Sequence, residues 1–167
     1  MRRSELGIIF SRRSIRKYHD TPVSSQDIET LLHAAMAAPS AHNKQHWQFL
    51  VVRDRATLNA LNDIHPYAKM LTEATLCIAV CGDKSKAFWV QDCSAAAQNI
   101  LLAATGLGLG SVWLGVHPYP ELVNPVSEML GIPEDYAPLC LIAIGHPAEE
   151  KGPSERFDQN KVHYERW

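Results

Sequence analysis

Three arginines and a serine near the start of the chain have the residue types and spacing to bind an anion. Arg12, Arg13, Ser14 and Arg16 fall within a run of five residues. A guanidinium group matches two phosphate oxygens at once, and a hydroxyl adds a short neutral donor. In an extended segment alternate side chains project to one side, so Arg12, Ser14 and Arg16 could converge on a single anion. A solvated basic face is the other interpretation of such a run, and it stays open.

The charge of the whole chain supports a local anion site. Sixteen basic and eighteen acidic residues give a net charge of −2, whereas residues 1–20 carry +4. A chain this close to neutral is not typical of a protein devoted to nucleic acid or to acidic membranes. The residues behind the local charge are Arg2, Arg3, Arg12, Arg13, Arg16 and Lys17, opposed by Glu5 and Asp20.

The glycine-rich stretch Gly106–Gly110 invites a dinucleotide-binding interpretation. That fingerprint must follow a strand and open a helix, so that the pyrophosphate meets the helix N-terminus. Here an apolar helix ends at Gly106 and a strand is predicted after Gly110, which is the reverse order. We therefore interpret the stretch as a helix end and a tight turn, with a backbone that something flat could approach closely.

The histidines and cysteines predict no metal site. His42 and His46 have the spacing of helical zinc ligands, but Asn43 stands where a metalloprotease has glutamate, and Pro39–Ser40 favours a loop. The four cysteines show no metal-ligand spacing and stand in apolar surroundings, so we expect buried thiols in a cytoplasmic protein. The apolar runs are strand-length, far short of the ~20 residues that span a bilayer. The sequence also lacks the nucleophile elbow of hydrolases and the phosphate-binding P-loop motif.

The elements that must position these residues form one domain, residues 1–167, which is long enough to bury its own core. A capping box at Ser24–Asp27 opens the first clear amphipathic helix. Helices and strands mix without strict alternation, which predicts an α+β domain with one central sheet. The predicted helices are Ile28–Met36, Arg55–Ile64, Ala95–Thr105 and Glu121–Leu130, and the predicted strands are Trp47–Val52, Thr75–Cys81, Ser111–Leu114 and Leu139–Ile144.

Four stretches in the same order resemble the nitroreductase-like flavoproteins in their short, single-domain form. The stretches are Arg12–Arg16, Pro39–Trp47, Gly110–Gly115, and Gly145–Lys151 with Arg156, and together they cover nearly the whole chain. One position departs from the pattern, since His46 stands where the family commonly has proline. The resemblance implies an α+β fold with a central mixed β-sheet flanked by helices, in an intertwined homodimer that binds FMN at the subunit interface.

The resemblance also implies roles for individual residues. Arg12, Ser14 and Arg156, with Arg13 in the same signature, would bind the FMN phosphate. Arg16 and Lys69 would stand near the pyrimidine edge of the flavin, where a cation favours reduction. The other implied cofactor-binding residues are Leu114, Gly115 and Val116, whose backbone amides would face the far edge of the ring, and Pro39, Ser40, Ala41 and Asn43, which would come from the partner subunit.

The activity implied is a ping-pong reaction in which NAD(P)H donates hydride and a nitroaromatic, a quinone or a similar electron-poor acceptor receives it. No catalytic acid, base or nucleophile is needed from the protein, because the cofactor does the chemistry. One alternative is another reaction on the same fold, reductive dehalogenation or flavin fragmentation, with His65–Thr72 or Ser85–Asp92 as a lid. The other is a non-enzymatic module that binds nucleic acid through Arg12–Lys17.

Overall fold

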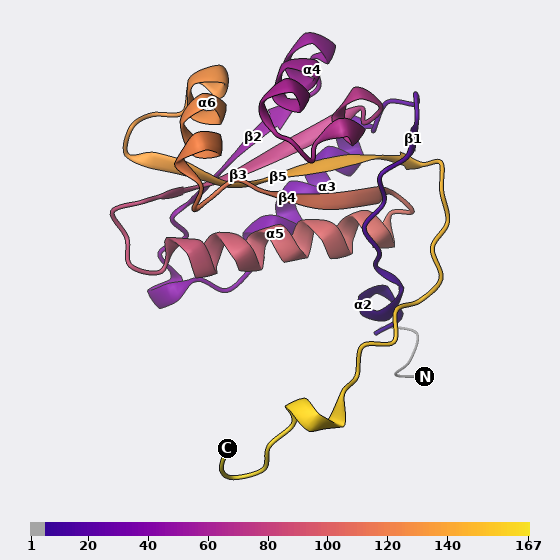
Figure 1. Cartoon of the computed structure of the whole chain (residues 1–167), viewed down its shortest axis with the longest axis vertical. Helices are drawn as coiled ribbons and strands as arrows, with labels where there is room; N and C mark the ends of the chain where they lie inside the picture. Colours follow the sequence, from indigo (N-terminus) through magenta and orange to yellow (C-terminus); the bar gives the residue numbers. More distant parts are fainter. Residues whose placement is uncertain (1–5) are drawn as a thin grey trace.

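A five-stranded antiparallel sheet lies at the centre of residues 6–167, which are the residues described by this computed structural model (Figure 1). Its strands are β1 (Tyr18–His19), β2 (Trp47–Val52), β3 (Leu76–Asp83), β4 (Gly110–Gly115) and β5 (Tyr136–Pro147). β5 pairs with β1, β3 and β4, and β2 pairs with β3. Arg2, Arg3 and Glu5, which contribute to the N-terminal charge, lie outside the described residues.

The direction of the strands differs from the mixed sheet that was expected. Every ladder between the five strands is antiparallel, and the one parallel contact within residues 6–167 is an isolated pairing of Ser14 with Ser111. An apolar run identifies a strand but contains no information on which neighbour it will meet or in which direction. The α+β class is confirmed, and the sheet within it is antiparallel.

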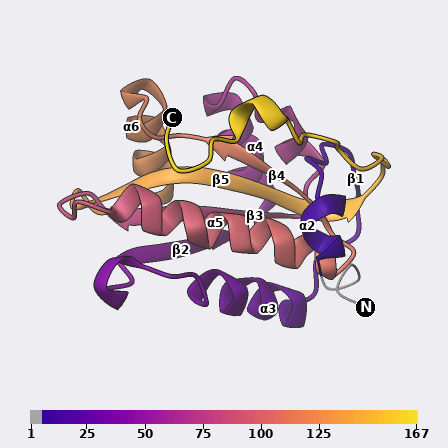
Figure 2. The same ribbon diagram turned by 90° about the horizontal axis from the view of Figure 1, so that it is seen from below.

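Helices cover both faces of the sheet (Figures 1 and 2). The side chains of Leu76, Ile78 and Val80 belong to one core cluster, and those of Cys77 and Ala79 belong to the other. The first cluster packs against α3 (Ser25–Met36) and α5 (Trp89–Gly106), and the second against α4 (Arg55–Ile64) and α6 (Pro120–Leu130). Strands buried on both faces are continuously apolar, which explains the uninterrupted runs in the sequence.

Local chemistry sets the helix ends largely as predicted. The hydroxyl of Ser24 accepts the backbone N–H of Asp27 at 3.0 Å, so the predicted capping residue opens α3. α5 begins at Trp89 and ends at Gly106, so the predicted start at Ala95 was too late. The extra turns contain the polar residues Gln91 and Asp92, which obscured the apolar pattern there.

The four cysteines are free and buried, as expected. Burial raises the pKa of the Cys77, Cys81 and Cys93 thiols to about 12 and raises that of Cys140 well above its usual value. Within residues 6–167, no helix is both long enough and apolar enough to span a membrane.

Two extended segments lie outside the helices and the long strands. Residues 12–17 follow the short helix α2 (Gly7–Ser11) and run along β4, where the N–H of Ile15 donates to the carbonyl of Ser111 at 3.0 Å. Beyond Pro147 the chain passes the same segment and then leaves the body of the molecule (Figure 1). Aromatic side chains on this tail are largely exposed, with Phe157 83% exposed, Tyr164 71% exposed and Trp167 fully exposed.

Candidate functional site

A cavity with a volume of about 600 Å³ lies where β4 ends. Arg16, His65, Tyr67 and Gly115 are among its lining residues. A second hollow shares Arg16 and Tyr67 with this cavity and adds Lys69. The size is typical of sites for small organic ligands, which occupy ~300–1,000 Å³. The fold thus brings Arg16 together with Gly115 on one side and with Lys69 on the other.

The backbone of β4 presents alternate residues to the cavity side. β4 pairs with β5 along one edge, and at its other edge the Ser111 carbonyl accepts the N–H of Ile15. Backbone direction alternates along a strand, so residues two and four positions beyond Ser111 also direct N–H and C=O away from β5. Gly115 is the residue four positions beyond. Its amide therefore faces outward at the end of the strand, beside the cavity.

The two glycines that bound β4 have different surroundings. A Cβ atom at Gly110 would lie 2.6 Å from Cγ2 of Ile15, so this glycine is required by packing. At Gly115 a Cβ would meet no heavy atom within 4 Å. The lack of a side chain at Gly115 therefore leaves open space that the folded chain itself does not fill.

The two neighbours of Gly115 are placed differently from the sequence expectation. Val116 is fully buried, and its N–H donates to the carbonyl of Leu139 at 3.0 Å. Leu114 lines the cavity, but the alternation along β4 directs its N–H toward β5. The expectation that all three residues present amides to a ligand is therefore wrong for Leu114 and Val116, because both amides face β5.

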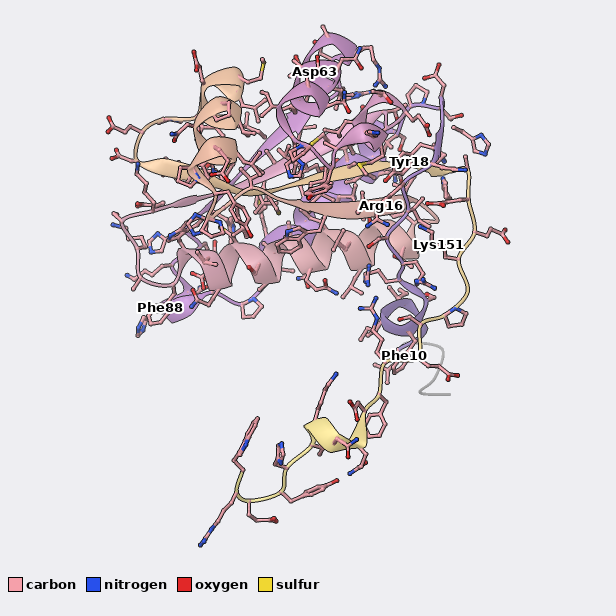
Figure 3. All side chains as sticks on the ribbon, viewed as in Figure 1. Phe10, Arg16, Tyr18, Asp63, Phe88 and Lys151 are labelled. Carbon is pink, nitrogen blue, oxygen red and sulfur yellow. The ribbon has the colours of Figure 1, made fainter. Side chains whose placement is uncertain are left out.

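The basic segment is held by two residues of the stretch Gly145–Lys151, to which the sequence assigned no individual role. The ammonium of Lys151 donates to the Ser14 carbonyl at 2.7 Å and lies 3.0 Å from the Glu149 carboxylate. That carboxylate in turn accepts the backbone N–H of Arg16 at 2.6 Å. This N–H, followed by the Lys151 ammonium, holds the pKa of Glu149 below its usual value. Figure 3 shows Arg16 and Lys151 at the same end of the molecule.

The arginines of the segment divide between structure and surface. The Arg13 guanidinium donates to the carbonyl of Gly152 and so helps to fix the tail. The side chains of Arg12 and Arg16 have no hydrogen bond or ion pair with any residue in the described range 6–167. Among the residues that the structure describes, two guanidinium groups are therefore available for an anion, while the third is occupied.

A buried histidine connects two walls of the cavity. Nε2 of His65 lies 2.8 Å from the carbonyl oxygen of Gly115, and the backbone N–H of Tyr67 donates to Nδ1 at 3.2 Å. His65 is 4% exposed, whereas Tyr67 is 77% exposed. No short motif marks such a residue, because its partner is fifty residues away along the chain.

The stretch that was considered as a lid is largely part of the wall. It contains the short helix η2 (Lys69–Thr72), in which Met70 and Leu71 are buried in the core. The other candidate lid, Ser85–Asp92, includes the first turn of α5.

Pro39, Ser40, Ala41 and Asn43 lie at a different place on the chain. Ala41 lines a smaller hollow together with Asp92, whose carboxylate accepts the Ala41 N–H at 2.9 Å. Figure 3 shows Phe88, another residue of this hollow, at the opposite end of the molecule from Lys151. Within one chain these residues do not meet the cavity beside Gly115. Arg156 is exposed on the tail, and no hydrogen bond joins it to Arg12 or Ser14 within residues 6–167.

Comparisons with known proteins agree on one family. The sequence profile of the nitroreductase family matches residues 9–66 and 65–146. A protein of Archaeoglobus fulgidus, provisionally named NADH dehydrogenase/NAD(P)H nitroreductase, is 46% identical over 97% of this chain and 98% of its own.

Solved structures of similar proteins have the same fold. A protein of Bacteroides thetaiotaomicron with the same provisional name superposes with a TM-score of 0.96, at 44% identity over 98% of both chains. A provisionally named nitroreductase of Desulfovibrio desulfuricans, solved in complex with FMN, has a TM-score of 0.83 and 34% identity, over 97% of this chain and 96% of its own.

Proposed function

The chain belongs to the nitroreductase family, and from this premise we propose that it is an FMN-dependent oxidoreductase that takes hydride from NAD(P)H and reduces electron-poor organic acceptors. Nitroaromatics and quinones are the acceptor classes proposed. The observation that carries the cofactor site is the end of β4, where Gly115 directs its amide away from β5 and leaves open space at the position of a side chain, beside a cavity of about 600 Å³.

The residues around this cavity fit FMN. The Gly115 backbone can approach a flat ring closely, because no heavy atom of residues 6–167 lies within 4 Å of the place where its Cβ would stand. Arg16 and Lys69 line one hollow and would stand at the pyrimidine edge of the ring, where their positive charge stabilises the electron-rich reduced form. Arg12 and the Ser14 hydroxyl would bind the phosphate, and Arg156 would join them.

A second copy of the chain would complete the site. Pro39, Ser40, Ala41 and Asn43 lie at the far end of the molecule from Arg16, so they can reach a flavin only from a partner subunit. We propose a homodimer in which each tail extends across the partner. The exposed aromatic side chains of Phe157, Tyr164 and Trp167 support this arrangement, because large apolar groups are normally covered.

Bound FMN supplies the chemistry of accepting and releasing hydride. The chain would bind and orient the cofactor: Gly115 would set the approach to one edge of the ring, and Arg16 and Lys69 would set the charge at the other. Donor and acceptor occupy the same open place in turn, which gives ping-pong kinetics. No side chain of the chain is assigned as an acid, base or nucleophile.

The cofactor proposal is tested by titrating the cofactor-free protein with FMN and following flavin fluorescence. We expect one FMN per chain, together with oxidation of NADH or NADPH when a nitroaromatic or a quinone is present. A protein that binds no flavin but binds nucleic acid in a salt-sensitive manner would contradict the proposal and favour the module interpretation. The four reduced, buried thiols support a cytoplasmic location, which fractionation of cells would test.

A further inference from the structure

We infer that His65 is a positioning residue of the flavin site, which fixes the backbone of Gly115 and joins it to the Tyr67 wall. The inference rests on the proposed function for the identity of the ligand. His65 does not need to touch the cofactor, because it acts through Gly115, which the cofactor approaches.

The hydrogen bonds of His65 define its protonation. Nδ1 accepts the backbone N–H of Tyr67 at 3.2 Å, so this nitrogen carries no proton. The proton of the neutral ring is then on Nε2, which donates to the Gly115 carbonyl at 2.8 Å. Both ring nitrogens are occupied, and the side chain is enclosed, with His65 only 4% exposed. The ring is therefore held in one tautomer and one orientation.

The Gly115 carbonyl needs such a donor because of its place in the sheet. It points away from β5, at an edge of β4 where the described residues 6–167 form no neighbouring strand beyond the segment that contains Ile15. Ile15 satisfies the outward carbonyl of Ser111, and His65 satisfies the outward carbonyl of Gly115. A glycine has wide backbone freedom. The carbonyl belongs to the Gly115–Val116 peptide, whose N–H donates to the carbonyl of Leu139, so His65 and Leu139 hold this peptide from opposite sides. Without the His65 bond, the peptide would be held on the β5 side alone, and the backbone at Gly115 would gain freedom.

The same ring also sets the distance between two sides of the cavity. His65 directly follows α4, and its own N–H closes that helix by donating to the carbonyl of Leu61 at 3.1 Å. Gly115 ends β4, and Tyr67 lines both hollows. One imidazole thus ties the end of a helix, the end of a strand and an exposed aromatic wall. This tie fixes the end of α4 and the end of β4 relative to each other, where both line the cavity.

Two neutral substitutions separate the halves of this role. In His65→Gln the amide nitrogen can reach the position of Nε2 and donate to Gly115. In His65→Asn the shorter side chain places its amide near the position of Nδ1. There it can accept the Tyr67 N–H but cannot reach the Gly115 carbonyl. Both variants remove the ring from the core, so a purely structural role for His65 predicts similar losses in the two.

The readouts are the FMN dissociation constant, the visible absorption bands of bound flavin, and the amide NMR signals of Gly115 and Val116 in the cofactor-free protein. We expect His65→Asn to weaken FMN about tenfold, to shift the flavin bands and to broaden the Gly115 signal. His65→Gln should stay within about threefold of the wild type. Imidazole nitrogen NMR of the cofactor-free wild type should show the tautomer protonated at Nε2.

Each outcome has a definite consequence. Equal FMN affinities and equal Gly115 signals in the two variants would overturn the inference, and so would a wild-type ring protonated at Nδ1. If His65→Asn does not fold, the tautomer and the His65→Gln variant still decide, because a large loss of FMN in a folded His65→Gln contradicts the role. Failure of the wild type to bind FMN would instead reject the proposed function. The His65 tautomer and the Gly115 amide signal would then still test whether His65 holds the Gly115 backbone.

Discussion

Gly115 and Gly110 bound the same strand, and their surroundings predict opposite consequences for the same substitution. Gly115→Val should leave the melting temperature of the cofactor-free protein within about 2 °C of the wild type, because the space is open and valine suits a strand. It should weaken FMN at least tenfold, because the side chain enters the space proposed for the ring.

Gly110→Val serves as the matched control for that experiment. Its Cβ would lie 2.6 Å from Cγ2 of Ile15, so the clash should lower the melting temperature by several degrees. Thermal melting of both cofactor-free variants and FMN titration of both separate the two effects. A Gly115→Val protein that melts early yet binds FMN normally would show that Gly115 serves packing alone.

Arg12 is predicted to bind the FMN phosphate. Arg12→Ala should lose charge-assisted hydrogen bonds of about 1.5–3 kcal/mol and weaken FMN roughly 10- to 100-fold, and Arg156→Ala should do the same. Arg53 offers a control, since it is an exposed arginine that follows β2, a strand that does not pair with β4. Isothermal titration of Arg12→Ala, Arg156→Ala and the control Arg53→Ala with FMN tests the assignment. Unchanged FMN affinity in Arg12→Ala and Arg156→Ala would contradict it.

At the scale of elements, the extended segment 12–17 depends on the tail that crosses it. The Glu149 carboxylate accepts the N–H of Arg16, and its pKa in the folded protein lies below the usual value of 4.5. A lowered folded pKa means that this contribution to stability is complete above about pH 4.5 and is lost as the pH falls toward the folded value.

The prediction that follows concerns Glu149→Gln. The variant should melt about 2 °C below the wild type at pH 7, and the difference should shrink as the pH falls below 4.5. Melting curves from pH 7 to pH 3 measure it. Gln159→Glu on the exposed tail is a control for altered charge. A difference that stays constant over this range would mean that the Glu149 charge contributes nothing to docking of the segment.

Several elements could be predicted from the sequence because their signals are local. The capping box at Ser24 and the apolar runs of β3 and β5 identify one helix and two strands directly. The two-residue strand β1 has no such signal, since it exists only because Tyr18 and His19 meet the end of β5. Strand direction was missed for the same reason, because pairing is decided between distant segments.

The candidate site was predicted in part. Basic residues and glycines have recognisable spacing, and the structure brings Arg16, Lys69 and Gly115 around adjoining hollows. Contacts such as His65 with Gly115 join segments far apart in sequence and follow from the assembled fold. The backbone direction of Val116 depends on its register with β5, which a single sequence does not reveal.

At the scale of the whole molecule, the tail is predicted to hold the dimer together. Deleting residues 158–167 removes Tyr164 and Trp167 but keeps Arg156, so the arginine that is proposed to bind the FMN phosphate remains in the chain. We expect the truncated protein to sediment as a monomer at micromolar concentration and to lose FMN on dilution. In the absence of FMN, the melting temperature of the truncated protein should report the stability of the monomeric core.

Lys161→Ala, an exposed change within the same tail, is the control and should leave the dimer intact. Analytical ultracentrifugation combined with flavin absorbance measures both properties. A truncated protein that stays dimeric with its full flavin content would show that the tail has no part in assembly.

The position of β5 in the chain also has a consequence for biosynthesis. β5 pairs with β1, β3 and β4. Leu76 of β3 pairs with Ile144 of β5, which is synthesised 68 residues later. A nascent chain that ends before Tyr136 can pair β2 with β3 but leaves the other edge of an apolar strand exposed. Formation of the sheet is therefore a late event in translation, and chains stalled before that point are the form most prone to aggregate or to recruit chaperones.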